Sequence, residues 1–430
     1  MMAKGKLARS VSIIGAGYTP LGNVSESPEM KDMTERELFA WACMEAMDNG
    51  HVKAKDIDAY YVGVSGPNYD SRFKSAAPFF GDWIGMHDKP TLFHDEACGS
   101  SAFGLEQAVL AVASGKYDCV ISGAVNINTS VPKGCYPPFV REQLDNETLW
   151  NEVYSAIDSA YEKPTYGSVG PVEALLEGYA IKYGVSRDEI DDCFVNYIIG
   201  KSQEALLNPK AIMVKRTYEE EAKRFRFDNI KKYLLDNRFN PLMGSIVRAR
   251  FLGTGVDAGA AIIVCATDIA PKISDRQPIE VAGIATIGTN DTTFCQYPLH
   301  SDEIIFKEAY EMAGITDPLH QVEYMGIHDC PASMVIPVSE AAGYIEPGQA
   351  WKYMRDGEMN HDGKKPINAT GGRTQSGHPR SPAFAIEVAE AVSQMRGESG
   401  ERQVPNPPKC SVVWGGGAGY NIGTCVLKTL

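Results

Sequence analysis

The sequence lacks the marks of several large protein classes. It carries 41 Lys and Arg residues against 55 Asp and Glu, a net charge of −14, so no basic excess indicates a nucleic-acid binder. Its longest apolar runs, such as Ala260–Ala266, fall far short of the roughly 18 residues that span a bilayer. Its 10 cysteines contain no CxxC pair, which argues against a disulfide scaffold or a zinc ribbon. We therefore expect a cytoplasmic protein with reduced thiols and neither membrane nor nucleic acid as a partner.

The composition that is present is that of a large globular protein. Of 430 residues, 44% are hydrophobic and 22% are charged, which supplies a large core. Short β-branched runs alternate with stretches of helical periodicity, and this alternation predicts an α/β layered fold. Strands are expected at residues 11–14, 57–64, 116–122, 255–266, 279–287, 322–327, 411–414 and 422–427. Helices are expected at 34–50, from about 98 to 114, and at 172–182, 187–206, 301–313, 331–342 and 381–395.

The order of these elements divides the chain into two similar halves, 1–270 and 271–430. Each half contains a helix, a glycine, a strand and a polar turn that carries a cysteine, so we expect pseudo-symmetry. Residues 126–240 are rich in Tyr, Pro and charge, and we expect them to form a loop domain inserted into the first half. Gly15-Ala16-Gly17 is expected to form a turn after the first strand.

Cys98 is the first candidate for chemistry. It lies in Ala97-Cys98-Gly99-Ser100 at the start of a predicted buried helix between two strands. The N–H groups at a helix N-terminus stabilise a thiolate, and the Cys98 N–H is a candidate oxyanion donor. A small buried cysteine that only fills space explains the same pattern.

Two histidines are the next candidates. His378 lies in Gly377-His378-Pro379, within a glycine-rich loop where a core residue is not expected, and it is a candidate base for a thiol. His328 and Cys330 lie in His328-Asp329-Cys330 at the end of a predicted strand, where side chains in α/β folds face the ligand crevice. A loop histidine bound to backbone, and an ordinary strand exit, remain alternatives.

A glycine run, Gly415–Gly417, follows the predicted strand at 411–414 and allows backbone N–H groups to approach an anion. A plain tight turn explains it equally well. The other histidines show no ligand spacing, so we expect no metal; they are His51, His87, His94, His300, His320 and His361.

Together, in this order, the cysteine at a helix start, the HDC turn, the GHP loop and the glycine run resemble the thiolase superfamily over almost the whole chain. Asn208-Pro209-Lys210-Ala211 and Asp257-Ala258-Gly259-Ala260 resemble two further stretches of that family. The resemblance implies a duplicated five-layer α-β-α-β-α fold with an inserted loop domain.

The resemblance also implies roles. Cys98 matches the nucleophile that becomes acylated, and His378 matches the histidine that activates it. His328 matches the HDCF motif of the sterol-carrier-protein-type branch, in which the motif cysteine, here Cys330, acts as acid and base. The amides of Cys98 and Gly417 match the oxyanion donors. Coenzyme A is implied as cosubstrate, with no permanently bound cofactor.

The chain departs from the family pattern at three positions, the first being the extra Ala258 between Asp257 and Gly259. Pro331 stands where the HDCF motif has Phe. Val413 stands where many thiolases carry a second catalytic cysteine before the glycine run, and this places the chain in the branch that uses Cys330 instead.

The implied activity is acyl-CoA C-acyltransfer, cleaving or forming a β-ketoacyl-CoA through an acyl-cysteine. Acetoacetyl-CoA is the default substrate; a bulky aromatic one such as benzoylsuccinyl-CoA is the alternative, with Tyr136-Pro137-Pro138-Phe139 and residues 161–166 as a candidate acyl pocket. A thiolase-fold retro-aldolase acting on β-hydroxyacyl-CoA and a non-catalytic scaffold subunit are the alternative functions. A homodimer and a small OB-fold zinc-finger subunit are the implied partners.

Overall fold

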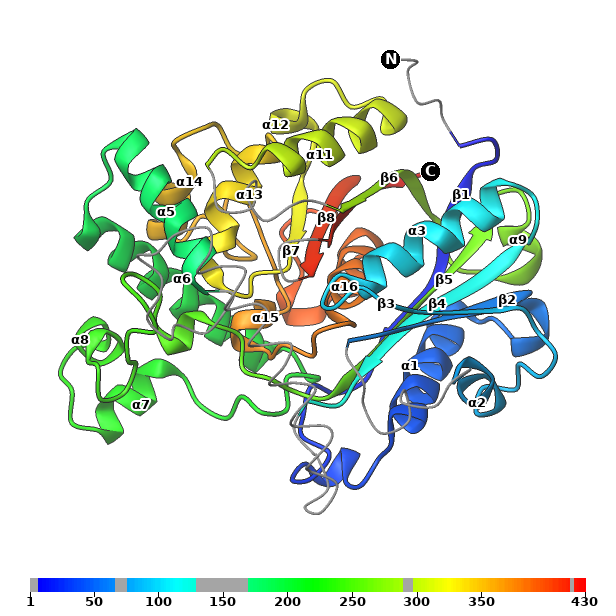
Figure 1. Ribbon diagram of the computed structural model, residues 1–430, viewed down its shortest axis with the longest axis horizontal. Helices are drawn as coiled ribbons and strands as arrows, with labels where there is room; N and C mark the ends of the chain where they lie inside the picture. The colour runs from blue at the N-terminus through cyan, green and yellow to red at the C-terminus, as the bar shows by residue number, and fades with distance from the viewer. Residues whose placement is uncertain (1–6, 66–75, 129–168, 289–296, 418–420) are drawn as a thin grey trace.

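The strands of the protein form one sheet. The computed structural model describes residues 7–65, 76–128, 169–288, 297–417 and 421–430 (Figure 1). Within these residues, a 9-stranded sheet has the order β3-β2-β4-β5-β1-β6-β9-β8-β7. The strands are β1 Val11–Tyr18, β2 Ala59–Val64, β3 Thr91–Asp95, β4 Cys119–Asn126, β5 Ala258–Ala266, β6 Ile279–Gly288, β7 Tyr324–Ile327, β8 Cys410–Gly417 and β9 Asn421–Thr429.

The pairing pattern of the sheet repeats. In the first half β2 is parallel to β4, while β4 and β5, and β5 and β1, are antiparallel. In the second half β7 is parallel to β8, while β8 and β9, and β9 and β6, are antiparallel. A short antiparallel contact between β1 and β6 joins the two sets. The predicted α/β fold is therefore confirmed.

Helices cover and separate the two sets of strands (Figure 1). On the outside, α1 (Glu35–Gly50) contacts β1, β4 and β5, and α11 (His300–Ala313) contacts β6 and β9. Between the sets, α3 (Ser100–Ala113) and α16 (Ala383–Arg396) contact each other and strands of both halves. The result is five layers, α-β-α-β-α, with α3 and α16 in the middle.

Two glycines mark the same feature in each half. A bulge interrupts β1 between Ile13 and Gly15, and another interrupts β6 between Val281 and Gly283. A Cβ at Gly15 would lie 2.2 Å from the Ala46 carbonyl oxygen of α1, and the equivalent distance at Gly283 is 2.1 Å, to an oxygen of α11. Glycine is needed because the outer helix lies against the strand. The expectation of a turn at Gly15-Ala16-Gly17 is wrong, since these residues continue β1.

The two ends of α1 are capped in different ways. Thr34 and Glu37 form a capping box at its start. At the other end His51, with φ of 52°, adopts the left-handed conformation, while Gly50 belongs to the helix and lies against Gly15. The expected helix over 331–342 is also divided, into a 3-10 turn at Ala332–Met334 and α13, Val335–Ala341.

The remaining helices lie mostly beside the second half (Figure 1). A buried apolar cluster joins the second half of the sheet to α5 and α6. These helices include α2 Ala77–Asp82, α5 Val169–Tyr183, α6 Arg187–Leu207, α7 Tyr218–Arg224, α8 Ile230–Leu235, α14 Ala350–Arg355 and α15 Gly372–Gln375. The expected pocket segments at 136–139 and 161–166 lie outside the described residues. Among the described helices, none has the length and apolarity to cross a membrane.

Candidate active site

Cys98 lies on a tight turn between β3 and α3. Ala97 has a φ of 51°, and Gly99 is the cap residue before α3 begins at Ser100. The Glu96 N–H donates to Oγ of Ser100 at 2.8 Å, and that hydroxyl lies 2.6 Å from the Val64 carbonyl oxygen, its acceptor. The turn is therefore fixed to β2, and it leaves Cys98 partly exposed just before the helix.

His328 follows β7 directly and is anchored to β8. Its N–H donates to the Trp414 carbonyl oxygen at 3.0 Å, and its Nδ1 lies 2.8 Å from the Gly416 carbonyl oxygen. Asn368 holds the residue before it, since its Oδ1 accepts from the Ile327 N–H at 2.6 Å and its Nδ2 donates to the Ile327 carbonyl at 2.8 Å. The imidazole therefore has a fixed position and a fixed orientation.

His378 is held by backbone bonds to the segment that leads into β5. Its N–H donates to the Thr254 carbonyl oxygen at 2.7 Å, and its own carbonyl oxygen accepts from the Val256 N–H at 3.3 Å. Gly377, with φ of 113°, precedes it, and a Cβ there would lie 2.6 Å from Val256 Cγ1. The loop that carries His378 is thus closely packed.

The fold brings the four predicted side chains into one place. The ligand-forming atoms of Cys98, His328 and His378 all lie within 4.8 Å of one another. His328 Nε2 and His378 Nε2 are 2.9 Å apart, with the rings stacked at 4.8 Å between centroids. On the other side of the His378 ring, its Nδ1 lies 3.5 Å from Cys330 Sγ.

These contacts assign the protons. The Gly416 carbonyl oxygen only accepts, so His328 carries its proton on Nδ1 and has a lone pair on Nε2. His378 then donates from its own Nε2 to that lone pair, and its Nδ1 accepts from the Cys330 thiol. In the resting site the hydrogen bonds therefore run, from donor to acceptor, from Cys330 to His378, from His378 to His328, and from His328 to the Gly416 carbonyl oxygen.

Burial keeps the three side chains of this hydrogen-bonded series neutral. It lowers the pKa of His328 to about 4, although Asp329 opposes the shift, and it lowers the pKa of His378 well below the usual value for histidine. Burial also raises the pKa of the Cys330 thiol to about 12. At neutral pH the site therefore holds two neutral imidazoles and a protonated Cys330.

The glycine run lies beside the turn that carries Cys98. Gly415–Gly417 belong to β8 and do not form the expected turn. A Cβ at Gly417 would lie 2.3 Å from the Glu96 carbonyl oxygen and 3.3 Å from the Cys98 backbone nitrogen. A Cβ at Gly99 would lie 3.2 Å from the Gly417 nitrogen. The structure thus places the Cys98 and Gly417 amides near each other, where only glycine fits.

Asp329 links the HDC turn to the loop that carries His378, and sequence reasoning gave it no role. Its carboxylate is fully buried and accepts from the Tyr197 hydroxyl at 2.8 Å, from Thr374 Oγ1 at 2.9 Å and from the backbone N–H groups of Arg373 and Thr374 at 2.5 and 3.4 Å. It thereby joins the HDC turn to the loop before His378. The one feature of the sequence that could have pointed to Asp329 is its position between the candidate residues His328 and Cys330.

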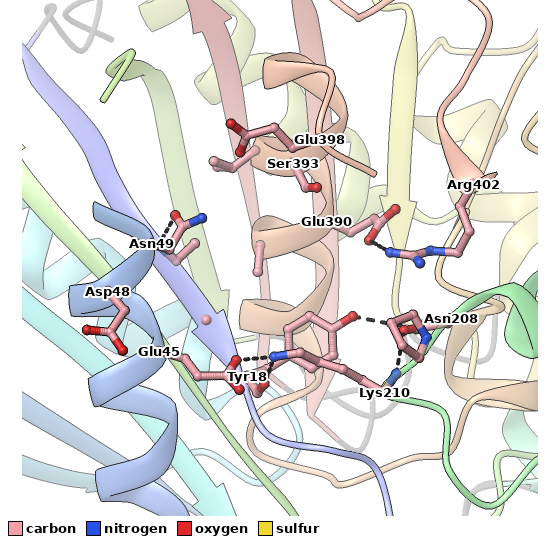
Figure 2. Close-up of a pocket in the computed structure, with 15 residues that line it drawn as sticks. Tyr18, Glu45, Asp48, Asn49, Asn208, Lys210, Glu390, Ser393, Glu398 and Arg402 are labelled. Atoms are coloured by element: carbon pink, nitrogen blue, oxygen red, sulfur yellow. Dashed lines mark hydrogen bonds and ion pairs between the residues drawn. The ribbon is translucent and has the colours of Figure 1, made fainter. Parts of the chain in front are cut away.

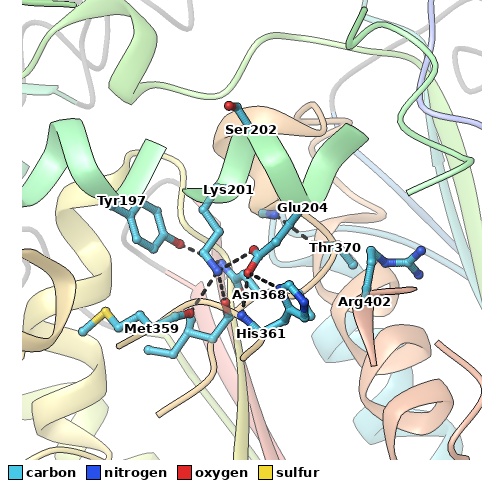
Figure 3. Close-up of polar contacts among 12 residues, drawn as sticks. Tyr197, Lys201, Ser202, Glu204, Met359, His361, Asn368, Thr370 and Arg402 are labelled. Atoms are coloured by element: carbon cyan, nitrogen blue, oxygen red, sulfur yellow. Dashed lines mark hydrogen bonds and ion pairs between the residues drawn. The ribbon is translucent and has the colours of Figure 1, made fainter. Parts of the chain in front are cut away.

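A second polar cluster fixes α6 against the same region (Figure 3). Lys201 is fully buried and donates to Glu204 Oε2 at 2.6 Å and to the Met359 and Ile367 carbonyl oxygens at 3.0 and 2.5 Å. All three ammonium protons therefore have acceptors. Since Ile367 precedes Asn368, the cluster supports the residue that holds the end of β7.

A separate cavity of about 340 Å³ lies between α1, the end of β1 and α16 (Figure 2). Its two cations are already paired, Lys210 with Glu45 and Arg402 with Glu390. None of the candidate site residues lines it. We therefore do not assign the reaction to this cavity.

The structure thus places a thiol beside two imidazoles on a duplicated five-layer fold. Two family models match the chain, "Thiolase, N-terminal domain" over residues 11–205 and "Thiolase C-terminal domain-like" over 305–429. The chain belongs to the thiolase superfamily, in its sterol-carrier-protein-type branch, and is an acyltransferase.

Three curated relatives illustrate the family. An acetyl-CoA acetyltransferase of Methanothermobacter thermautotrophicus is 26% identical over 92% of this chain and 93% of its own. The benzoylsuccinyl-CoA thiolase subunit BbsB of Thauera aromatica is 29% identical over 37% of this chain and 42% of its own. Sterol carrier protein 2 of Rattus norvegicus is 22% identical over 65% and 54%.

Solved structures share the fold. An Ltp2-ChsH2(DUF35) aldolase has a TM-score of 0.71 at 17% identity, covering 98% of both chains. Human mitochondrial 3-ketoacyl-CoA thiolase in complex with CoA has a TM-score of 0.67 at 16% identity, covering 99% of both. The predicted thiolase-like fold is confirmed.

Proposed function

We propose that the protein cleaves or forms a β-ketoacyl-CoA through an acyl-Cys98 intermediate, with CoA as acyl acceptor. The observation that carries the proposal is the convergence of the Cys98 sulfur with a ring nitrogen of His328 and one of His378, all within 4.8 Å of one another. The thiolate attacks the keto carbon, the bond to the α-carbon breaks, and an acyl-CoA enolate leaves. The thiolate of CoA then takes the acyl group from Cys98.

The resting protons determine how Cys98 is activated. His378 Nε2 donates to His328, so it accepts the Cys98 proton only after its own proton passes to His328 Nε2, 2.9 Å away. This transfer leaves a thiolate, a neutral His378 that bears a new Nε2 proton, and a His328 imidazolium. A buried imidazolium alone is unstable, as its pKa of about 4 indicates. The thiolate, and then the enolate, supply the compensating charge.

The same transfer prepares the site for the enolate. Before it, the two facing Nε2 atoms share one N–H; after it, each bears one. Two N–H donors then face the space where the enolate oxygen develops its charge, which is the arrangement that stabilises an oxyanion. Cys330, whose raised pKa keeps it protonated, supplies the α-carbon proton. The acyl oxygen on Cys98 is held by the amides of Cys98 and Gly417.

Thiolysis assays test this function. Acetoacetyl-CoA and an aromatic β-ketoacyl-CoA such as benzoylsuccinyl-CoA are each incubated with CoA, and the acyl-CoA products are separated by mass. We expect Cys98→Ser to abolish turnover. Cys410→Ser is the control: it replaces a buried thiol at the end of β8 opposite Gly417, and we expect this variant to retain turnover. Turnover that survives Cys98→Ser contradicts the proposal, and aldehyde release from a β-hydroxyacyl-CoA by that variant supports the aldolase alternative.

Acetoacetyl-CoA is the expected substrate, because relatives over most of the chain are named acetyl-CoA acetyltransferases. The aromatic alternative is supported by the similarity to the benzoylsuccinyl-CoA thiolase subunit. The relative rates with the two substrates decide between them.

We also propose a homodimer that forms through β3. This strand ends the sheet, with β2 as its one neighbour within the described residues. Leu92 on β3 is 36% exposed, and Phe79 and Trp83, from α2 and the residue after it, are 48% and 50% exposed. An unpaired strand edge next to apolar side chains is a surface for a second copy. We expect Trp83→Glu to shift the molecular mass measured by light scattering toward the monomer.

A small OB-fold zinc-finger subunit is the second proposed partner. Two similar proteins carry names that indicate an assembly, a thiolase subunit and a DUF35 aldolase. Co-purification of such a subunit with the tagged chain is the test, and a chain with full thiolysis activity alone would show that the partner is not required.

A further inference from the structure

The three convergent side chains form a set of metal ligands. Within the described parts of the chain, Cys98, His328 and His378 are the one group of three or more His, Cys, Asp or Glu residues placed to hold a metal ion, with ligand atoms within 4.8 Å of one another. The three residues lie far apart in sequence, so ligand spacing gave no sign of the set. We propose that these residues bind one zinc ion, which reversibly blocks the Cys98 thiol. This inference does not depend on the acyl-transfer reaction.

The donor atoms suit zinc. Zn²⁺ takes imidazole nitrogen and thiolate sulfur in tetrahedral sites, with bonds of about 2.0–2.1 Å and 2.3 Å. These bonds place two nitrogens about 3.3 Å apart and a nitrogen and a sulfur about 3.6 Å apart. The observed Nε2–Nε2 distance is 2.9 Å, and the sulfur lies within 4.8 Å of both rings. Shifts of up to about 1.2 Å therefore complete the geometry.

Each imidazole also has a partner on its other nitrogen. His328 Nδ1 donates to the Gly416 carbonyl oxygen at 2.8 Å, and His378 Nδ1 lies 3.5 Å from Cys330 Sγ. Zinc-bound histidines are commonly oriented by such a second contact. Cys330 therefore orients a ligand and is not itself one, because it meets the nitrogen that faces away from the proposed ion.

Zinc binding releases one proton to solvent and moves another within the site. The Cys98 thiol loses its proton to solvent as the sulfur bonds to zinc. The Nε2 proton of His378 moves to its Nδ1, where the Cys330 sulfur accepts it. His328 keeps its Nδ1 proton and offers its Nε2 lone pair without change. Three protein ligands leave the fourth position open to water, and the partly exposed Cys98 gives the ion a route to the site.

Binding is measured with Zn²⁺ and Co²⁺ on the metal-free chain. Zinc is titrated against a chromophoric chelator, and Co²⁺ is followed by its thiolate-to-metal absorption. We expect one zinc per chain in the wild type and in Cys330→Ala. We expect the thiolate-to-cobalt band to be absent from Cys98→Ala and zinc affinity to fall in His328→Ala by more than in Cys330→Ala. His320→Ala, an exposed histidine, serves as the matched control.

A second readout needs no variant. Zinc should slow the alkylation of Cys98 by iodoacetamide, measured by peptide mass, and EDTA should restore the rate. A cobalt–thiolate band that persists in Cys98→Ala would assign the metal to other cysteines and overturn the proposal. An alkylation rate at Cys98 that zinc does not change would overturn it as well, whether or not the protein proves to be an acyltransferase on the substrates tested.

Discussion

The Tyr197 hydroxyl of α6 donates to Asp329 Oδ2 at 2.8 Å, although 132 positions separate the two residues. This bond fixes the HDC turn from the side of the inserted helices. Asp329 in turn accepts from the backbone of Arg373 and Thr374, in the loop that leads to His378. The relative position of His328, Cys330 and His378 therefore depends on a buried carboxylate.

Tyr197→Phe tests this positioning role. The variant loses a hydrogen bond to a charged group, and we expect a loss of about 1.5–3 kcal/mol in the free energy of unfolding. We also expect kcat to fall by about tenfold, since small displacements of reacting groups are costly, with KM little changed. Tyr310→Phe is the matched control. It removes a hydrogen bond to the carbonyl oxygen of Ala342, the residue that follows α13. Equal kcat in the two variants would contradict the role.

Cys330→Ala separates the two half-reactions. Cys98 and both imidazoles remain, so we expect acyl-Cys98 still to form from an acyl-CoA. The α-proton has no donor or acceptor, so exchange of the acetyl-CoA α-hydrogens with deuterated water should fall by at least about 100-fold. Exchange is measured by NMR or by mass. Normal exchange in the variant would assign the proton transfer to another group.

Gly417 and Gly416 provide a matched pair at the oxyanion donors. A Cβ at Gly417 would lie 2.3 Å from the Glu96 carbonyl oxygen, whereas the nearest atoms at Gly416 are side chains at 3.2 Å. Gly417→Ala must therefore displace the backbone beside Cys98, and we expect it to lower the acylation rate by about 100-fold or more. Gly416→Ala should have a much smaller effect. Stopped-flow acylation rates make the comparison.

His361 should make stability depend on pH (Figure 3). Its Nδ1 lies 3.3 Å from Glu204, which raises the pKa of His361 above 6.5, while Lys201 opposes and Asp362 supports the shift. The folded chain thus binds this proton more tightly than the unfolded chain. The stabilisation is complete below about pH 6.5 and is lost as the pH rises through the folded pKa. Compared with His361→Gln, the wild type should gain stability on acidification from pH ~8.5 to ~5.5.

Urea unfolding at several pH values gives this difference directly. A constant difference in the free energy of unfolding between the wild type and His361→Gln would contradict the assignment. Lys201 and Glu204 are present in both proteins, so the contact between them is common to the comparison.

Local patterns in the sequence predicted much of the fold and the four candidate side chains. The helix that starts after Thr34 and the buried strand predicted at 57–64 follow from local patterns, and the structure has both. Cys98 stands out at the start of a predicted helix, His328 and Cys330 at the end of a predicted strand, and His378 in a glycine-rich loop. Their convergence was expected from family resemblance, and no pattern along the chain implies it.

Other features depend on contacts that sequence does not display. The glycines of β1 resemble a turn, but they are required by the approach of α1 to the strand. Strand β3 carries exposed and polar residues at the sheet edge, so no apolar alternation revealed it. Tyr197 and Lys201 lie on α6 among ordinary helical residues, and only the packing of α6 against the catalytic loops gives them a role.

The most direct test of the account is the mass of the intact protein after brief mixing with acetyl-CoA or acetoacetyl-CoA. The account predicts an added acetyl group on the wild type with either thioester and on Cys330→Ala with acetyl-CoA, none on Cys98→Ala, and recovery of the original mass after free CoA is added. An adduct on Cys98→Ala, or no adduct on a wild-type protein that turns over its substrate, would contradict the acyl-Cys98 mechanism.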